Sequence, residues 1–278
     1  MKFTKMEALA NDFIMIAPAD ELEADRLGAR AALLCDRRRG IGADGIIFVL
    51  PPRSEKADFR MRIINADGSE AEMCGNGIRC FAKFVNEANI SDRHELAIDT
   101  GAGLIRTGRN DTEVRVDMGP PILEAARIPT TETADRILDH PLEVEEQTYR
   151  VTAVSMGNPH AVIHVPKITD ELVLVEGPKL ERHPFFPNHA NIEFIEVLDR
   201  SHIRMRVYER GCGETAACGT GACAAVVAGV LTGRNDVMVT VHLNGGDLSV
   251  EWDGDPAHSV FMTGPARTVF TGRIDLDR

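Results

Sequence analysis

The sequence predicts a mixed α/β (α+β) fold built from two similar domains, and three observations lead to this prediction. The chain has 278 residues, nearly twice the roughly 150 residues of an average domain. Its 44% hydrophobic and 27% charged residues are ordinary for a globular protein and exclude disordered, collagen-like and coiled-coil chains. Residues 58–85 align without a gap onto residues 202–229. The halves are therefore expected to be copies of one strand–turn–helix arrangement, related by a pseudo-twofold axis.

The repeat is defined by identical residues 144 positions apart. The coinciding pairs are Arg60/Arg204, Met61/Met205, Arg62/Arg206, Glu70/Glu214, Cys74/Cys218, Gly75/Gly219 and Gly77/Gly221. A weaker match sets residues 8–16 above 155–163 and pairs Asn11 with Asn158. Because the period far exceeds 20–50 residues, the repeat indicates a duplicated domain and not a solenoid.

Each predicted element follows from a local pattern. Residues 24–40 are amphipathic, with Cys35 on the apolar side. Alternating residues predict strands over 59–64 and 203–208. Helical spacing of apolar residues follows Cys74, whereas 222–228 is apolar all round, which predicts a fully buried helix that ends near Gly233. We expect residues 262–272 to form a strand that returns to the first domain, giving domains of 1–118 plus 264–278 and of 119–263.

Charge and hydropathy limit the partners and the location. The formal net charge is −12 and the pI is near 5.2, and such a field repels nucleic-acid phosphates. Polar residues interrupt the N-terminal segment, so no secretory signal is expected. The longest near-apolar run, 222–231, is half the ~20 residues of a membrane span. We expect no nucleic acid, no membrane and a cytoplasmic location.

The six cysteines divide into two groups. No pair has C-x-x-C spacing, so no zinc or other metal site is expected. The packing group is expected to comprise Cys35, Cys80, Cys212 and Cys223. Cys74 and Cys218 differ, because each precedes a Gly-x-Gly turn at the start of a predicted buried helix. Helix N-termini lower thiol pKa values and bind anions.

Two equivalent thiols suit the inversion of a carbon stereocentre. One thiolate removes a proton from one face, and a thiol opposite it delivers a proton to the other face. The helix N–H groups can hold a carboxylate and the charge that develops beside it. A P-loop is excluded because no Gly-Lys-Ser/Thr follows, and a Cys-His protease leaves the second Cys-Gly-x-Gly unexplained. A non-catalytic thiol protein, such as a redox sensor, remains an alternative.

The sequence resembles the diaminopimelate epimerase family over nearly its whole length. The most specific resemblance lies in MCGNG and ERGCGETAACGTG. In family order, the matching segments are NDFI (11–14), RRGIGADG (38–45), NADGSEAEMCGNGIRC (65–80), VDMGPP (116–121), GNPHAV (157–162), GPKLERHPFFPNHANIEF (177–194), ERGCGETAACGTGA (209–222) and MTGPA (262–266).

The resemblance implies two α/β domains, each with a curved mixed sheet around a central helix, and an active site in the cleft. It implies an epimerase that interconverts LL-2,6- and meso-2,6-diaminopimelate in lysine and peptidoglycan-precursor biosynthesis, without pyridoxal phosphate or metal. The implied partners are this small amino-acid substrate and a second copy in a homodimer, with Phe270 near the dimer contact.

The resemblance also assigns roles to residues. Cys74 and Cys218 match the base and the acid. The matched groups for the α-carboxylate are Gly75, Asn76, Gly219 and Thr220. The other substrate-binding positions are Asn11, Asn65, Asn158, Asn191, Glu209 and Arg210. His160 and Glu209 match residues that tune the thiol pKa values.

The sequence departs from the family pattern at four positions. Gly45 stands where some members have a ligand-contacting glutamine, Ala8 and Ala10 replace usual glycines, and Cys212 stands at a position that is often alanine. The nearest enzymatic alternative is a proline or hydroxyproline racemase, whose substrate lacks a second amino-acid head. Glu209 beside Arg210 argues against it, since these side chains suit a distal ammonium and carboxylate.

Overall fold

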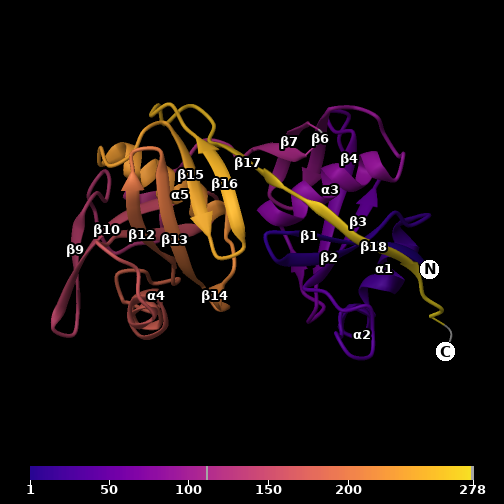
Figure 1. Cartoon of the computed structure of the whole chain (residues 1–278), viewed down its shortest axis with the longest axis horizontal. Coiled ribbons are helices and arrows are strands. Elements are labelled where there is room, and N and C mark those ends of the chain that lie inside the picture. Colours follow the sequence, from indigo (N-terminus) through magenta and orange to yellow (C-terminus); the bar gives the residue numbers. More distant parts are fainter. Residues whose placement is uncertain (111, 277–278) are drawn as a thin grey trace. The chain divides into compact units, whose positions relative to one another are not determined.

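A computed structural model describes residues 1–110 and 112–276. The chain divides into two compact units (Figure 1). Unit 1 comprises Met1–Val116 with Thr263–Arg278, and unit 2 comprises Asp117–Met262. Strands β8 and β17 carry the chain across the two unit boundaries.

Unit 1 is a mixed sheet with one long helix, α3. Its elements are β1 (Lys2–Ala8), β2 (Asn11–Ile16), α1 (Glu21–Gly28), α2 (Ala31–Leu34), β3 (Gly45–Leu50), β4 (Phe59–Asn65), β5 (Glu70–Ala71), α3 (Gly75–Glu87), β6 (Glu95–Thr100), β7 (Gly103–Arg109), β8 (Glu113–Asp117), β17 (Phe261–Pro265) and β18 (Arg267–Arg273). Strand β2 is parallel to β3, whereas β1 is antiparallel to β2 and to β18. Helix α3 packs against β1, β2 and β3, and its apolar face is buried there.

Unit 2 repeats this plan around helix α5. Its elements are η1 (Ala125–Arg127), β9 (His140–Val144), β10 (Gln147–Ser155), β11 (Pro159–His164), η2 (Leu172–Glu176), α4 (Gly177–Glu181), β12 (Asn191–Asp199), β13 (His202–Glu209), β14 (Gly213–Thr215), α5 (Gly219–Leu231), β15 (Met238–Leu243) and β16 (Gly246–Glu251). Helix α5 contacts β10, β11, β12, β13 and β16 (Figure 1), so the sheet curves around it. This explains why α5 is apolar on every side.

The two units share one pattern of strand pairing. The order β2, β3, β4, β5, α3, β6, β7 corresponds to β11, β12, β13, β14, α5, β15, β16. Both orders begin with a parallel pair and continue with antiparallel and parallel pairings of the same kind. At the start of the parallel pair, Phe13 lies opposite Gly45 in unit 1 and His160 lies opposite Asn191 in unit 2. The predicted mixed α/β fold with repeated units is confirmed.

Most predicted elements form where the sequence places them. Residues 59–64 and 203–208 lie in β4 and β13, and both cysteine-headed helices are present. Residues 267–273 pair with β1, as expected for a returning strand. The amphipathic stretch 24–40 covers the end of α1, all of α2 and the loop that follows α2. Among the described residues, no helix is long and apolar enough to cross a membrane.

The cysteine prediction was right for three of the four packing positions. Cys35, Cys80 and Cys223 are buried, and burial raises the pKa of the Cys35 thiol to about 11. Cys212 is exposed, so its assignment as a packing residue was wrong. It lies in the tight turn between β13 and β14, whose positive-φ glycines at 211 and 213 keep the backbone at the surface.

Candidate functional site

Cys74 caps the N-terminus of α3. Its backbone is extended (φ −145°, ψ 120°), and its Sγ accepts a hydrogen bond from Gly77 N at 3.3 Å. A Cβ at Gly77 would lie 2.9 Å from Ile47 Cδ1. The glycine therefore lets the first helical turn approach β3 closely, with the sulfur beside the positive end of the helix.

Two asparagines and a buried arginine surround Cys74. Cys74 Sγ lies 3.6 Å from Asn11 Oδ1, which also accepts from Asn76 Nδ2 at 3.3 Å. Arg79 is fully buried. Its guanidinium donates to Gly75 O at 2.9 Å and to Asn76 Oδ1 at 2.8 Å. These bonds hold the helix head and orient the amide of Asn76.

A charged network outside the predicted site fixes Asn11. Asn11 Nδ2 donates to Asp44 Oδ2 at 2.7 Å, so its Oδ1 is the atom that faces Cys74. Arg37 bridges Asp12 and Asp44, with 2.8 Å to each carboxylate. Burial raises the pKa of Asp12, but Arg37 and Lys5 outweigh it and hold this pKa well below its usual range. Asp12 therefore stays ionised at neutral pH.

Cys218 caps α5 with the same geometry as Cys74. Its backbone is extended (φ −124°, ψ 112°), and its Sγ accepts from Gly221 N at 3.4 Å. The residue is only 6% exposed. Burial raises the pKa of the Cys218 thiol well above its ordinary value, and the carboxylates of Glu209 and Glu193 raise it further. Cys218 is therefore a thiol at neutral pH in this structure.

Cys218 belongs to a continuous hydrogen-bond chain within unit 2. Its Sγ lies 3.5 Å from Thr220 Oγ1, which accepts from Asn158 Nδ2 at 3.3 Å. Asn158 Oδ1 lies 3.0 Å from His160 Nε2. His160 Nδ1 lies 2.6 Å from Glu193 Oε1, and neither His160 nor Glu193 is exposed to solvent. Cys218, Thr220, Asn158 and His160, which the sequence singled out, are thus brought together.

Three more predicted residues of unit 2 lie where β12 begins and β13 ends, namely Asn191, Glu209 and Arg210. Asn191 Oδ1 accepts from Arg210 N at 2.9 Å, and Asn191 Nδ2 donates to Pro159 O at 3.2 Å. Glu209 accepts from the Thr215 hydroxyl. Arg210 is exposed, with one nitrogen 3.3 Å from Asn188 O. Glu209 is the last residue of β13 and Arg210 follows it in the turn, so the two side chains can present opposite charges to one ligand.

Asn65 ends β4 in unit 1. Its Nδ2 donates to Ser69 Oγ at 2.9 Å, within the turn between β4 and β5. With a 144-residue offset it corresponds to Glu209 in unit 2. Equivalent strand ends therefore carry a neutral amide in one unit and a carboxylate in the other.

Two departures from the family pattern have visible consequences. Ala10 lies at φ 66° in the two-residue turn between β1 and β2, a conformation that favours glycine. A Cβ at Gly45 would lie 2.8 Å from Ile64 O, so a side chain there requires the strand to shift. Ala8 is buried at the end of β1 without positive φ.

Three residues that support the site were missed by the sequence reasoning: Asp44, Arg79 and Glu193. Arg79 and Glu193 are charged positions inside otherwise apolar buried segments, and that contrast is a signal that could have marked them. Asp44 carries no comparable signal, because an aspartate in a polar turn is common. Among residues 1–110 and 112–276, no three His, Cys, Asp or Glu side chains gather in an arrangement that could hold a metal ion.

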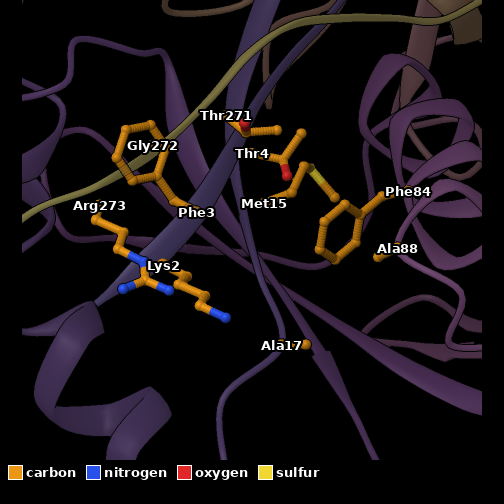
Figure 2. A pocket seen from close by; sticks show the side chains of 10 residues that line it. All are labelled: Lys2, Phe3, Thr4, Met15, Ala17, Phe84, Ala88, Thr271, Gly272 and Arg273. Atoms are coloured by element: carbon orange, nitrogen blue, oxygen red, sulfur yellow. The ribbon is translucent and has the colours of Figure 1, made fainter.

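A cavity of about 510 Å³ lies in unit 1, between β1, β2, β18 and α3 (Figure 2). Phe3, Met15 and Phe84 give it apolar walls, and Lys2 and Arg273 lie at one side. None of the predicted substrate-binding residues lines it. Phe270 of β18 is 46% exposed and packs edge-on against Phe3, with ring centroids 5.9 Å apart.

Solved structures share this fold at low sequence identity. A hydroxyproline epimerase from Agrobacterium vitis aligns with a TM-score of 0.71 and 17% identity, over 100% of this chain and 93% of that chain. A probable proline racemase from Agrobacterium radiobacter K84 aligns with a TM-score of 0.70 and 20% identity, over 99% and 93%. At these identities the likeness shows a shared fold, and in this chain a cysteine stands at the head of each central helix.

Sequence comparison gives the particular family. The family model described as diaminopimelate epimerase matches residues 3–124 and 152–269. A diaminopimelate epimerase from Moorella thermoacetica is 53% identical over the full length of both chains. A chloroplastic diaminopimelate epimerase from Oryza sativa subsp. japonica is 50% identical over 98% of this chain and 79% of its own. The chain belongs to the diaminopimelate epimerase family, an isomerase family of amino-acid biosynthesis.

Proposed function

We propose that this protein interconverts LL- and meso-2,6-diaminopimelate by a two-base mechanism in which Cys74 and Cys218 are the catalytic residues. The observation that carries the proposal is the repeated cap geometry. In each unit a cysteine sulfur lies at the head of a buried helix and accepts the N–H of the third residue beyond it. Family membership supports the substrate.

In the proposed reaction, a thiolate takes the α-proton and the C–H electron pair stays on carbon as an enolate-like carbanion. The opposite thiol gives its proton to the other face of that carbon, which inverts the centre and leaves a thiolate behind. One cysteine gains a proton and the other loses one, so no oxidant or reductant is needed. The raised pKa of Cys218 supports the thiol role for this residue in the substrate-free protein.

The helix heads are proposed to hold the reacting carboxylate. The first N–H groups of a helix have no partner inside it, so the backbone at Gly75, Asn76, Gly219 and Thr220 can donate to a carboxylate and to the charge that grows beside it. The polar side chains at the strand ends are proposed to bind the substrate, including its distal amino-acid head. These are Asn11, Asn65, Asn158, Asn191, Glu209 and Arg210. Of these, Arg210 suits the carboxylate and Glu209 the ammonium group.

Deuterium exchange tests the proposal directly. Reduced protein is incubated with LL-diaminopimelate in D₂O, and α-deuterium and meso product are followed by NMR. We expect both to appear, and Cys74→Ala and Cys218→Ala each to abolish conversion. Cys212→Ala is the matched control, because Cys212 is exposed and outside both caps. Full conversion by either cap variant would rule out the two-base scheme. Binding of diaminopimelate without α-deuterium exchange would favour a non-catalytic thiol protein. Activity on proline but not on diaminopimelate would favour a proline racemase.

We further propose a homodimer in the cytoplasm. Val269 and Phe270 of β18 are about half exposed and adjoin the apolar cavity of unit 1, which supports a contact between copies there. The cytoplasm suits the mechanism because both thiols must stay reduced. Phe270→Asp should shift the mass measured by light scattering from dimer to monomer; a monomeric wild-type protein would reject the dimer.

A further inference from the structure

The fully buried His160–Glu193 pair occurs in unit 2 only, although the two units share one pattern of strand pairing. In unit 2, His160 lies opposite Asn191, and Glu193 is two residues further along β12. In unit 1, Phe13 lies opposite Gly45, and Ile47 is two residues further along β3. A Cβ at Gly221 would lie 2.8 Å from Glu193 Oε1, and one at Gly77 would lie 2.9 Å from Ile47 Cδ1. Ile47 and Glu193 therefore fill the same place behind the helix cap.

The fold itself does not require charge at this place. Phe13 and Ile47 are buried and fill it in unit 1 with apolar atoms. A buried ion pair is weak evidence for stability, since apolar residues of similar volume often serve as well or better. Glu193 Oε2 is also buried without a hydrogen-bond partner among the described residues. Burying this polar pair costs free energy that the apolar pair of unit 1 does not. The pair in unit 2 therefore indicates a functional role and not only a packing role.

The hydrogen-bond directions show what the pair can do. Asn158 Nδ2 donates to Thr220 Oγ1, so Asn158 Oδ1 must accept, and His160 Nε2 must carry the hydrogen. The Thr220 hydroxyl, having accepted from Asn158, has its own hydrogen for Cys218 Sγ. With its hydrogen on Nε2, His160 can hydrogen-bond a carboxyl partner through Nδ1 only if one further proton is shared between the two atoms. Glu193 Oε1, 2.6 Å away, is that partner.

We propose that Glu193 is a positioning residue for Cys218: by sharing a proton with His160 it directs the chain His160–Asn158–Thr220 to donate toward the Cys218 sulfur. The inference rests on the proposed function and deepens it. Hydrogen bonds donated along His160–Asn158–Thr220 stabilise the Cys218 thiolate once the thiol has lost its proton, whereas the negative charge of the neighbouring carboxylates stabilises the thiol. The charged and titratable groups around this place are His160 on β11, Glu193 on β12, Glu209 on β13 and Cys218 itself.

The test is Glu193→Gln, with Glu196→Gln as matched control. Glu196 lies on the same strand but pairs with Arg204, away from the chain. We expect Glu193→Gln to lower kcat with diaminopimelate by at least about tenfold with KM changed by less than about twofold. Without Glu193 to share a proton with His160, the hydrogen-bond chain should donate less to the sulfur, so the pH midpoint for alkylation of Cys218 by iodoacetamide, mapped by peptide mass spectrometry, should move to higher pH. Loss of a nearby negative charge alone would move it to lower pH. The control should keep wild-type values. Wild-type kcat and an unchanged midpoint in Glu193→Gln, a midpoint that moves to lower pH, or equal changes in the control, would overturn the proposal.

A double variant covers the possibility that Glu193→Gln does not fold. His160→Phe with Glu193→Ile copies the apolar pair of unit 1, so its melting temperature should not fall, whereas kcat should fall at least as far as in Glu193→Gln. A folded double variant with wild-type kcat would refute the positioning role. The alkylation measurement needs no turnover, so it tests Glu193 even if wild-type protein fails to epimerise diaminopimelate, a failure that would count against the proposed function alone.

Discussion

Gly77 and Gly221 occupy the same helical position in the two units and allow one substitution to be made in two environments. An alanine Cβ at Gly221 would meet Glu193 Oε1 at 2.8 Å, and this carboxylate is already held 2.6 Å from His160 Nδ1. At Gly77 the same atom would meet the free end of the Ile47 side chain at 2.9 Å. The first neighbour is fixed and the second can rotate.

The magnitudes follow from these contacts. Overpacking costs about 1–3 kcal/mol, and straining a hydrogen bond to a charged group adds about 1.5–3 kcal/mol. Alanine gains about 1 kcal/mol over glycine in a helix. Gly221→Ala should therefore destabilise unit 2 by about 1.5–5 kcal/mol. Gly77→Ala should be close to neutral, because an off-rotamer isoleucine costs only about 0.5–1.5 kcal/mol.

Urea unfolding measures the difference. Trp252, the single tryptophan, lies buried in unit 2, so its fluorescence reports that unit, and far-UV circular dichroism reports both. We expect a clear loss in midpoint for Gly221→Ala and almost none for Gly77→Ala. Equal losses within about 0.5 kcal/mol would refute the argument that the carboxylate behind Cys218 is held rigidly.

Three further predictions concern stability. Burial lowers the pKa of His164 to about 4, whereas a histidine in the unfolded chain titrates near 6.5. As the pH drops from 6.5 to 4 the unfolded chain therefore takes up a proton that the folded chain does not, and the free energy of unfolding should fall by up to about 3 kcal/mol. The urea midpoint of His164→Phe should lack this dependence on pH. Ala10→Gly should raise the melting temperature, by about 0.5–1 kcal/mol of stability, because it relieves a positive φ; a lowered temperature would contradict this. Gly229→Ala should cost about 3 kcal/mol in urea unfolding, since its Cβ would lie 1.4 Å from the buried Asn235 Oδ1; a loss below about 1 kcal/mol would show that Asn235 moves aside freely.

The sequence was sufficient for the parts of the fold that depend on local pattern. Alternating residues over 59–64 predicted a strand, and the strand β4 forms there. The all-apolar segment 222–228 predicted a buried helix, and the helix α5 forms there. The amphipathic pattern over 24–40 gave no helix bounds, because apolar residues recur on both sides of Gly28, where α1 ends. Cys212 was misplaced because an isolated cysteine has no neighbours in sequence that report its exposure.

The candidate site was predictable only where residues stand in motifs. The place of Cys74 and Cys218 at helix heads followed from Cys-Gly-x-Gly, but their catalytic role and the proposed domain limits stay predictions. Glu193 and Asp44 act through partners that lie 33 residues away in sequence, His160 and Asn11. Such contacts depend on the register in which the strands pair, and this register cannot be read from one sequence before the sheet is known.

The pairing of β1 with β18 imposes an order on folding during synthesis. Unit 2 is continuous in the chain and has all of its strands once Met262 has been added. Strand β1 is made before unit 2, yet Lys2 pairs with Arg273, which is made after unit 2. Because closing so long a loop is slow, unit 1 is completed after unit 2. Until then, the free edge of β1 is open to wrong partners, and a chaperone that covers this edge would raise the yield of folded protein.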